Sequence, residues 1–124
     1  MGDFQKLKVW QRAKDLAVYT YKAIGKSQLT KDYCLEDQIW RSSVSVPSNI
    51  AEGEESGTNR QSVKFFRIAK GSKAEVLNQA VIANEIGYFT NTQFDHIKEE
   101  CQAVSSMLTN LIKSREKVAL NPKL

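Results

Sequence analysis

The amino-acid sequence predicts an all-α protein, an antiparallel four-helix bundle with up-down-up-down topology. Apolar residues recur every three or four positions in four segments of helical length. Glycines separate these segments, at Gly25, Gly53, Gly57 and Gly87. The connections are only a few residues long, and short connections between long helices favour antiparallel neighbours.

The chain length suits one domain. The 124 residues can bury one core, and a content of 41% hydrophobic and 26% charged residues is typical of folded proteins. We therefore expect a single domain over residues 1–124. Its four helices are expected at about 7–25, 32–53, 59–86 and 93–117.

The first two helices are indicated by their end residues. Gly25 is suited to end the first helix, and Thr30 or Asp32 can cap the start of the second. Pro47 lies inside the second helix, where the apolar spacing continues unchanged, so we expect a kink rather than a break. The alternative is a strand over SSVSV, where polar and apolar residues alternate.

The third helix begins with a capping box formed by Thr58 and Gln61, and it ends at Gly87. Thr92 and Asp95 mark the start of the fourth helix. Its apolar stripe follows a spacing of four, three, four and three residues through Ile97, Cys101, Val104, Leu108 and Leu111.

The second helix is apolar on two faces. One face contains Ile39, Val46 and Ile50, and the other contains Trp40, Val44, Pro47 and Ala51. A helix that is apolar on two faces should be covered on both, so the second face predicts contact with another subunit. On the third helix, Phe65 and Ile68 lie outside the centre of the core face and are assigned to the same interface.

Polar residues at the end of the second helix predict a buried hydrogen-bonded layer. Asn49 flanks the core face, and Ser72 or Glu75 on the third helix are candidate partners near the connecting turn. Glu52 completes the predicted layer. We favour this structural role over a ligand site.

Basic residues line the outer faces of two helices and form a candidate nucleic-acid surface. The net charge is +4, with six basic and two acidic residues in 1–26, two and six in 27–57, and five and two in 58–90. Such rows can follow a phosphate backbone, with one aromatic ring for stacking. The candidates are Lys8, Arg12, Tyr19, Lys22, Arg60, Lys64 and Arg67. The alternative interpretation is a solvated charged face.

The sequence indicates neither an enzyme nor a cofactor or metal site. His96 is the single histidine and has no glutamate three residues before it, so the di-iron pattern of four-helix bundles is absent from the sequence. Cys34 and Cys101 are expected to remain thiols. The sequence has neither a membrane-length apolar run nor a signal-type N-terminus, which predicts a cytoplasmic protein.

The sequence resembles the 23S rRNA-intervening-sequence proteins, also called four helix bundle proteins. The similarity lies in FQKLKVWQRA, in QIWRSSVSVPSNIAEG from Gln38 to Gly53, and in FFRIAKGSKAE from Phe65 to Glu75. The resemblance implies a bundle that assembles into rings, commonly pentamers. It also implies an association with nucleic acid, because related accessory proteins of diversity-generating retroelements are thought to bind it. Trp40 stands where the family commonly has a basic residue, which favours packing for that face.

The predicted function is therefore a non-enzymatic homo-oligomer that binds RNA or DNA through its basic faces. The alternative is a protein-interaction scaffold without nucleic-acid binding. The oligomer interface is assigned to Trp40, Val44, Ala51, Phe65 and Ile68.

Overall fold

The computed structural model describes the backbone of residues 3–120 and the side chains of residues 3–118. The helices and two short 3-10 helices follow the order η1 (Phe4–Lys6), α1 (Lys8–Gly25), η2 (Gln28–Lys31), α2 (Tyr33–Glu55), α3 (Asn59–Ile86) and α4 (Asn91–Leu120). No residue between 3 and 120 lies in a strand.

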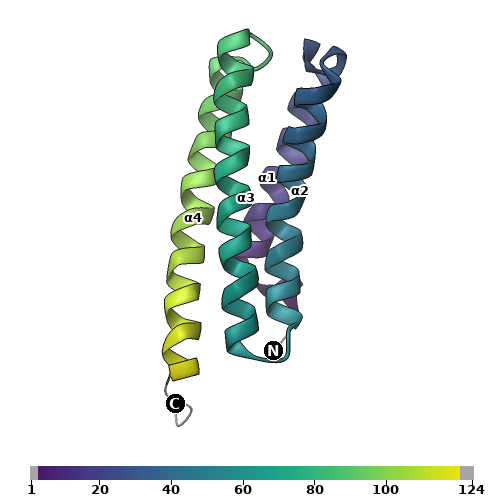
Figure 1. Ribbon diagram of the computed structural model, residues 1–124. Coiled ribbons are helices and arrows are strands. Elements are labelled where there is room, and N and C mark those ends of the chain that lie inside the picture. Colours follow the sequence, from purple (N-terminus) through teal and green to yellow (C-terminus); the bar gives the residue numbers. More distant parts are fainter. Residues whose placement is uncertain (1–2, 121–124) are drawn as a thin grey trace.

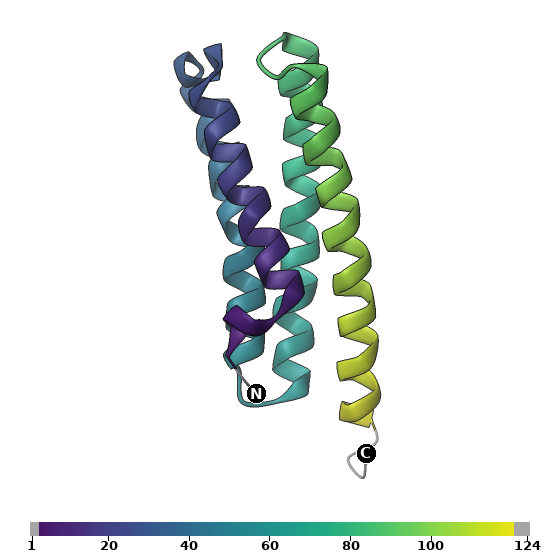
Figure 2. The same cartoon turned by 180° about the vertical axis from the view of Figure 1, so that it is seen from behind.

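Successive helices run in opposite directions, as Figures 1 and 2 show from two sides. Each helix packs against its neighbours in the chain, and α1 also packs against α4. The predicted all-α, up-down-up-down four-helix bundle is confirmed. We call the end with the α2–α3 turn the lower end, and the opposite end the upper end; the first and last described residues both lie at the lower end (Figure 1).

Side-chain caps fix where the helices begin. Asp32 accepts a hydrogen bond from the Leu35 N–H (3.3 Å), and Thr58 accepts one from the Gln61 N–H (3.1 Å). Gly87 ends α3 in the left-handed region with φ 98°. These three residues have the predicted roles.

The start of α4 and the end of α2 differ from the prediction. Thr90 and Gln93 form a reciprocal capping box with distances of 3.0 and 3.1 Å, so α4 starts at Asn91, two residues early. Helix α2 continues past Gly53 to Glu55 and runs through Pro47 without interruption. The strand alternative for SSVSV is therefore wrong.

The core lies along the bundle axis and takes apolar side chains from all four helices. Phe66 and Phe89 are its largest fully buried side chains. At the upper end, the Tyr88 hydroxyl donates to the Asp32 carboxylate (3.1 Å), and this hydrogen bond, together with burial, raises the pKa of Tyr88. The bond ties the α3–α4 connection to the start of α2.

Candidate interaction surfaces

Exposed apolar residues form a strip along the boundary between α1 and α2, which we call the α1–α2 strip: Val18, Tyr21, Trp40 and Val44. Trp40 is 38% exposed and Val44 37%, and the Tyr21 and Trp40 ring centroids are 4.9 Å apart. Ala51 is half-buried and lies about two turns below Val44 on α2. A pocket of about 600 Å³ opens at its upper end, beside Tyr33.

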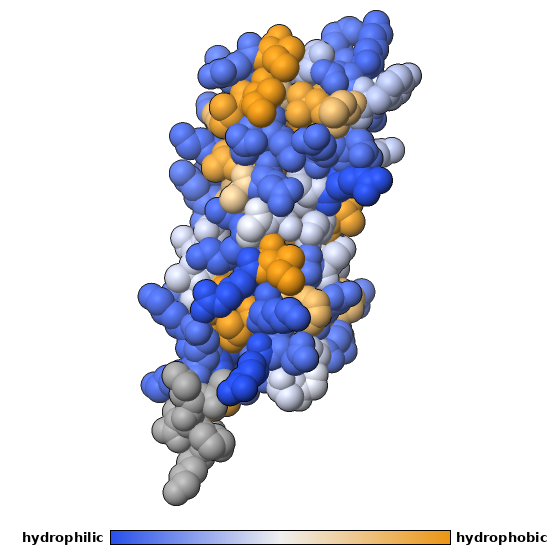
Figure 3. All heavy atoms as spheres, viewed as in Figure 1, coloured by the Kyte–Doolittle hydropathy of each residue, from blue (hydrophilic) through white to orange (hydrophobic). Residues whose placement is uncertain are grey.

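A second set of exposed apolar residues, the α3 strip, lies on the outer surface of α3: Ile68, Ile82 and Ile86, which are 43%, 42% and 55% exposed. Apolar groups gather at the upper end of α3 and again lower down, with hydrophilic surface between them (Figure 3).

A polar ridge on α2 separates the two strips. Asp37, Arg41, Ser48 and Glu52 are exposed, and their spacing of four, seven and four residues places them on one line along the helix. Asp37 and Arg41 form an ion pair of 2.9 Å on this ridge. The residues assigned to one interface therefore lie on two sides of the molecule. Trp40, Val44 and Ala51 lie on one side, and Ile68, with the half-buried Phe65, lies on α3.

The predicted polar layer is present in part. Asn49 donates to the backbone oxygen and to Oγ of Ser45, both at 2.9 Å, and Ser45 Oγ lies 2.8 Å from Ser72 Oγ. Asn49 and Ser72 are thus linked through Ser45. The side chains of Glu52 and Glu75 are exposed and take no part in these hydrogen bonds; Glu52 lies on the outer face of α2, whereas Glu75 lines the open groove between α2 and α3.

Gln79 extends this layer toward the upper end, although it is absent from the predicted layer. The Gln79 side-chain amide lies 2.6 Å from Ser42 Oγ; with the amide turned so that its nitrogen faces the surrounding acceptors, it donates to this hydroxyl and to the backbone oxygens of Gln38 and Glu75 (3.2 Å each). Gln79 is buried, so these bonds compensate for its lost hydration. A glutamine at a core position of a helix is the sequence signal that could have identified it.

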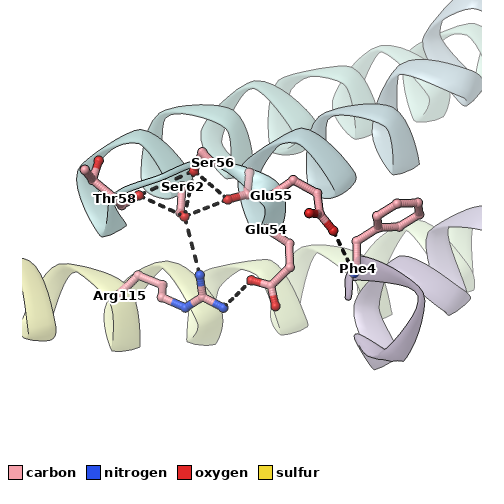
Figure 4. Close-up of polar contacts among 8 residues, drawn as sticks. Phe4, Glu54, Glu55, Ser56, Thr58, Ser62 and Arg115 are labelled. Carbon is pink, nitrogen blue, oxygen red and sulfur yellow. Dashed lines mark hydrogen bonds and ion pairs between the residues drawn. The ribbon is translucent and has the colours of Figure 1, made fainter. Parts of the chain in front are cut away.

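A buried charge cluster closes the lower end of the bundle (Figure 4). Arg115 of α4 donates to the Glu54 carboxylate at 2.7 Å, and only 17% and 9% of these side chains are exposed. Arg115 also donates to Ser62 Oγ (3.4 Å), which in turn donates to the Gly53 carbonyl (2.6 Å). Its guanidinium carbon lies 5.5 Å from the centre of the Phe66 ring. The cluster joins α2, α3 and α4 at their lower ends.

Gly53 is required beside this cluster because the Phe66 ring lies against its backbone. A Cβ at position 53 would lie 2.6 and 2.8 Å from two Phe66 ring carbons and 3.2 Å from the Ser62 carbonyl oxygen. The absent side chain lets α3 approach α2 closely. Gly53 therefore serves close packing inside α2 and does not end the helix.

On α1, two of the four candidate nucleic-acid residues already have partners. Arg12 binds Glu100 of α4 through two contacts of 2.7 and 3.3 Å, which lowers the pKa of Glu100 and raises that of Arg12. Tyr19 is half-buried, with its ring centroid 4.1 Å from that of His96. Lys8 and Lys22 are exposed.

On α3, the basic row continues onto α4. Arg67 pairs with Glu116 of α4 at 2.9 Å, which places the lower part of α3 beside the last turns of α4. We use the term basic end for four exposed residues around this pair: Arg60, Lys64, Lys113 and Lys117. Among the described residues, no acidic side chain forms an ion pair with any of these four.

The described part of the chain contains no group of three or more His, Cys, Asp or Glu residues arranged to hold a metal ion. Cys34 is exposed, whereas burial raises the pKa of Cys101 to about 12. None of the helices in that part combines the length and apolar character needed to cross a membrane.

The fold and these surfaces define a class: a four-helix bundle with exposed apolar strips and a group of exposed basic residues. The sequence profile of the 23S rRNA-intervening sequence proteins matches residues 5–110. The chain belongs to this family. No curated protein matches the sequence significantly.

The fold is also similar to a crystal structure determined at 1.70 Å, that of a protein with unknown function from the S23 ribosomal protein family of Bacteroides thetaiotaomicron. The two chains are 22% identical, the TM-score is 0.77, and the similarity covers 85% of this chain and 95% of the other. This similarity supports the fold.

Proposed function

We propose that the protein is a non-enzymatic, self-assembling subunit, with five copies in a ring as the family resemblance implies. The observation that carries self-assembly is the α1–α2 strip. It presents an indole, a phenol ring and two valines side by side at the surface. An exposed, contiguous apolar patch of this kind on a single chain commonly marks a protein–protein interface.

Replacing Trp40 by glutamate is expected to dissociate the assembly without unfolding the bundle. The indole is already 38% exposed within one chain, so the charge costs little there, but it would be desolvated between two chains. Light scattering coupled to size exclusion should give an oligomer for the unmodified protein and one chain for Trp40→Glu.

The matched control is Ser106→Glu, which adds the same charge at an exposed position of α4 and should leave the mass unchanged. Circular dichroism should report the same helix content in all three proteins. A single-chain mass for the unmodified protein would refute self-assembly.

A second proposed activity is binding of RNA or DNA at the basic end. Its support is the cluster of four exposed cations on two adjacent helices, without acidic partners in the described residues. A row of unpaired lysines and arginines can displace the counterions of a phosphate backbone. Assembly would repeat the basic end in each copy and increase avidity for a long strand.

Neutralising Arg60 and Lys64 together, as Arg60→Gln and Lys64→Gln, is expected to weaken binding to a single-stranded RNA oligonucleotide. The slope of log affinity against log salt should fall by about 1.4, from about 0.7 per lost phosphate contact. Fluorescence anisotropy at a series of salt concentrations measures both quantities.

The control for this pair is Lys8→Gln with Lys22→Gln on α1, which removes the same charge from a face where Arg12 is bound to Glu100. Equal losses in both double variants would indicate a general charge effect rather than a site. Absence of binding at low salt would favour the protein-interaction scaffold.

A further inference from the structure

The pocket at the upper end of the α1–α2 strip lies where α1 ends and α2 begins (Figure 1). Its volume of about 600 Å³ falls in the range of about 300–1,000 Å³ that is usual for ligand sites. Three aromatic side chains line it, those of Tyr21, Tyr33 and Trp40. Among the described residues, the charged side chains in its lining are both carboxylates, from Glu36 and Asp37.

The aromatic walls of this pocket suit a cation. The Tyr21 and Trp40 ring centroids are 4.9 Å apart with their planes tilted by 53°, so the two rings form an angled wall rather than a flat stack. Tyr33, in the first turn of α2, adds a third ring that is 79% exposed. The faces of aromatic rings carry negative partial charge and attract cations. A methylated ammonium fits such walls better than a primary ammonium, which is strongly hydrated.

Glu36 supplies the negative charge of the pocket. It is half-buried, and among the described residues no basic side chain forms an ion pair with it. Asp37, in contrast, is paired with Arg41. The start of α2 adds a partial positive charge of about half a unit, and the Asp32 carboxylate that caps this helix offsets it. Glu36 is therefore the carboxylate that remains to attract a cationic ligand.

We propose that this pocket binds a small organic cation with a quaternary ammonium group, of the choline type. The aromatic rings contact its methyl groups, and the Glu36 carboxylate balances its charge across the pocket. A quaternary nitrogen has no hydrogen to donate, so the site needs no hydrogen-bond acceptor aimed at it. All the lining residues come from one chain, so the site does not depend on self-assembly, although it shares Tyr21 and Trp40 with the α1–α2 strip.

A pair of ligands tests whether the positive charge is recognised. Choline and 3,3-dimethylbutan-1-ol have the same shape, but a carbon replaces the ammonium nitrogen in the alcohol. Isothermal titration calorimetry should show that choline binds the full-length protein about tenfold more tightly than the alcohol. Equal affinities would mean that the pocket is only an apolar groove, and they would overturn the proposal.

The two tryptophans of the chain provide an internal comparison. Trp40 lines the pocket, whereas Trp10 packs against Phe4 with ring centroids 5.1 Å apart. Choline should shift the indole N–H resonance of Trp40 and leave that of Trp10 in place, and the variant Trp10→Phe assigns the two signals. A choline titration that leaves the Trp40 resonance unmoved contradicts the site.

Two variants test the residues that hold the cation. Tyr33→Ala should weaken choline binding about two- to fivefold, which corresponds to one exposed cation–π contact. Glu36→Gln should also weaken it, because the carboxylate charge is lost. Glu52→Gln is the matched control, since it makes the same change at an exposed position about four turns away on α2. Choline affinities that stay unchanged in both Tyr33→Ala and Glu36→Gln would overturn the proposal.

A final variant separates this proposal from self-assembly. Val44→Arg disrupts the α1–α2 strip below the pocket, so it opens the pocket if neighbouring copies cover it, and its positive charge does not itself attract choline. Binding of choline by the unmodified protein or by Val44→Arg supports the site. Absence of binding in both overturns it, whichever mass light scattering gives.

The trimethylammonium group occurs both in free solutes and in lipid head groups. Cosedimentation of the unmodified protein, but not of Tyr33→Ala, with phosphatidylcholine vesicles would assign the cation to a lipid. Binding of free choline without cosedimentation would assign it to a solute. Both results support recognition of the cation.

Discussion

Replacing Arg115 by methionine is expected to lower the free energy of unfolding by about 3–5 kcal/mol. The substitution keeps an apolar stem over the Phe66 ring but leaves the Glu54 carboxylate, of which only 9% is exposed, without its 2.7 Å partner. The loss therefore comes from an uncompensated buried charge. Urea unfolding followed by circular dichroism measures it.

Two companion variants separate this mechanism from others. The double variant Glu54→Leu with Arg115→Met removes both charges and should recover most of the lost stability, because a buried pair contributes little beyond an apolar pair of similar volume. Arg67→Met breaks the exposed pair with Glu116 and should cost less than about 1 kcal/mol. Equal losses from Arg67→Met and Arg115→Met would contradict the account.

Replacing Gly53 by alanine is expected to destabilise the bundle by about 2–3 kcal/mol. In an exposed helix position this change stabilises, because alanine has the higher helix propensity. At position 53 the new methyl group would lie 2.6 Å from a ring carbon of Phe66, and that ring is fully buried and cannot move aside.

Gly71→Ala is the matched control. Gly71 lies in the interior of α3 and is exposed, and a methyl group at this position would meet nothing within 4 Å beyond the backbone of its own helix. This variant should raise the free energy of unfolding by about 0.5–1 kcal/mol. Thermal unfolding of both variants should therefore show shifts of opposite sign. Stabilisation by Gly53→Ala would show that α2 and α3 can separate at no cost.

The sequence is sufficient for features that depend on neighbouring residues. Asp32 and Thr58 are predictable as caps because a cap and its N–H partner are three residues apart. The helical periods likewise predict four helices and their core faces. Thr90 and Gln93 have the same capping pattern two residues before Thr92 and Asp95, so the start of α4 could have been identified from the sequence.

Features that depend on distant residues cannot be derived in this way. Glu100 follows Arg12 by 88 positions, and Arg115 follows Glu54 by 61, so no local spacing indicates either pair. The sequence pattern predicts a helix end at Gly53, but α2 continues to Glu55. In the sequence, a glycine that allows close packing inside a helix cannot be distinguished from a glycine that ends one. The separation of the α1–α2 strip from the α3 strip by the polar ridge of α2 also depends on how the helices pack.

The even number of helices has a practical consequence. The chain leaves the bundle at the same end at which it enters, since Asp3 and the end of α4 both lie at the lower end (Figure 1). Copies can therefore be fused in tandem through a short linker, or a single copy circularly permuted, without threading a segment along the length of the bundle. A fluorescent protein fused before η1 or after α4 would project from the lower end of the bundle and leave the upper end accessible.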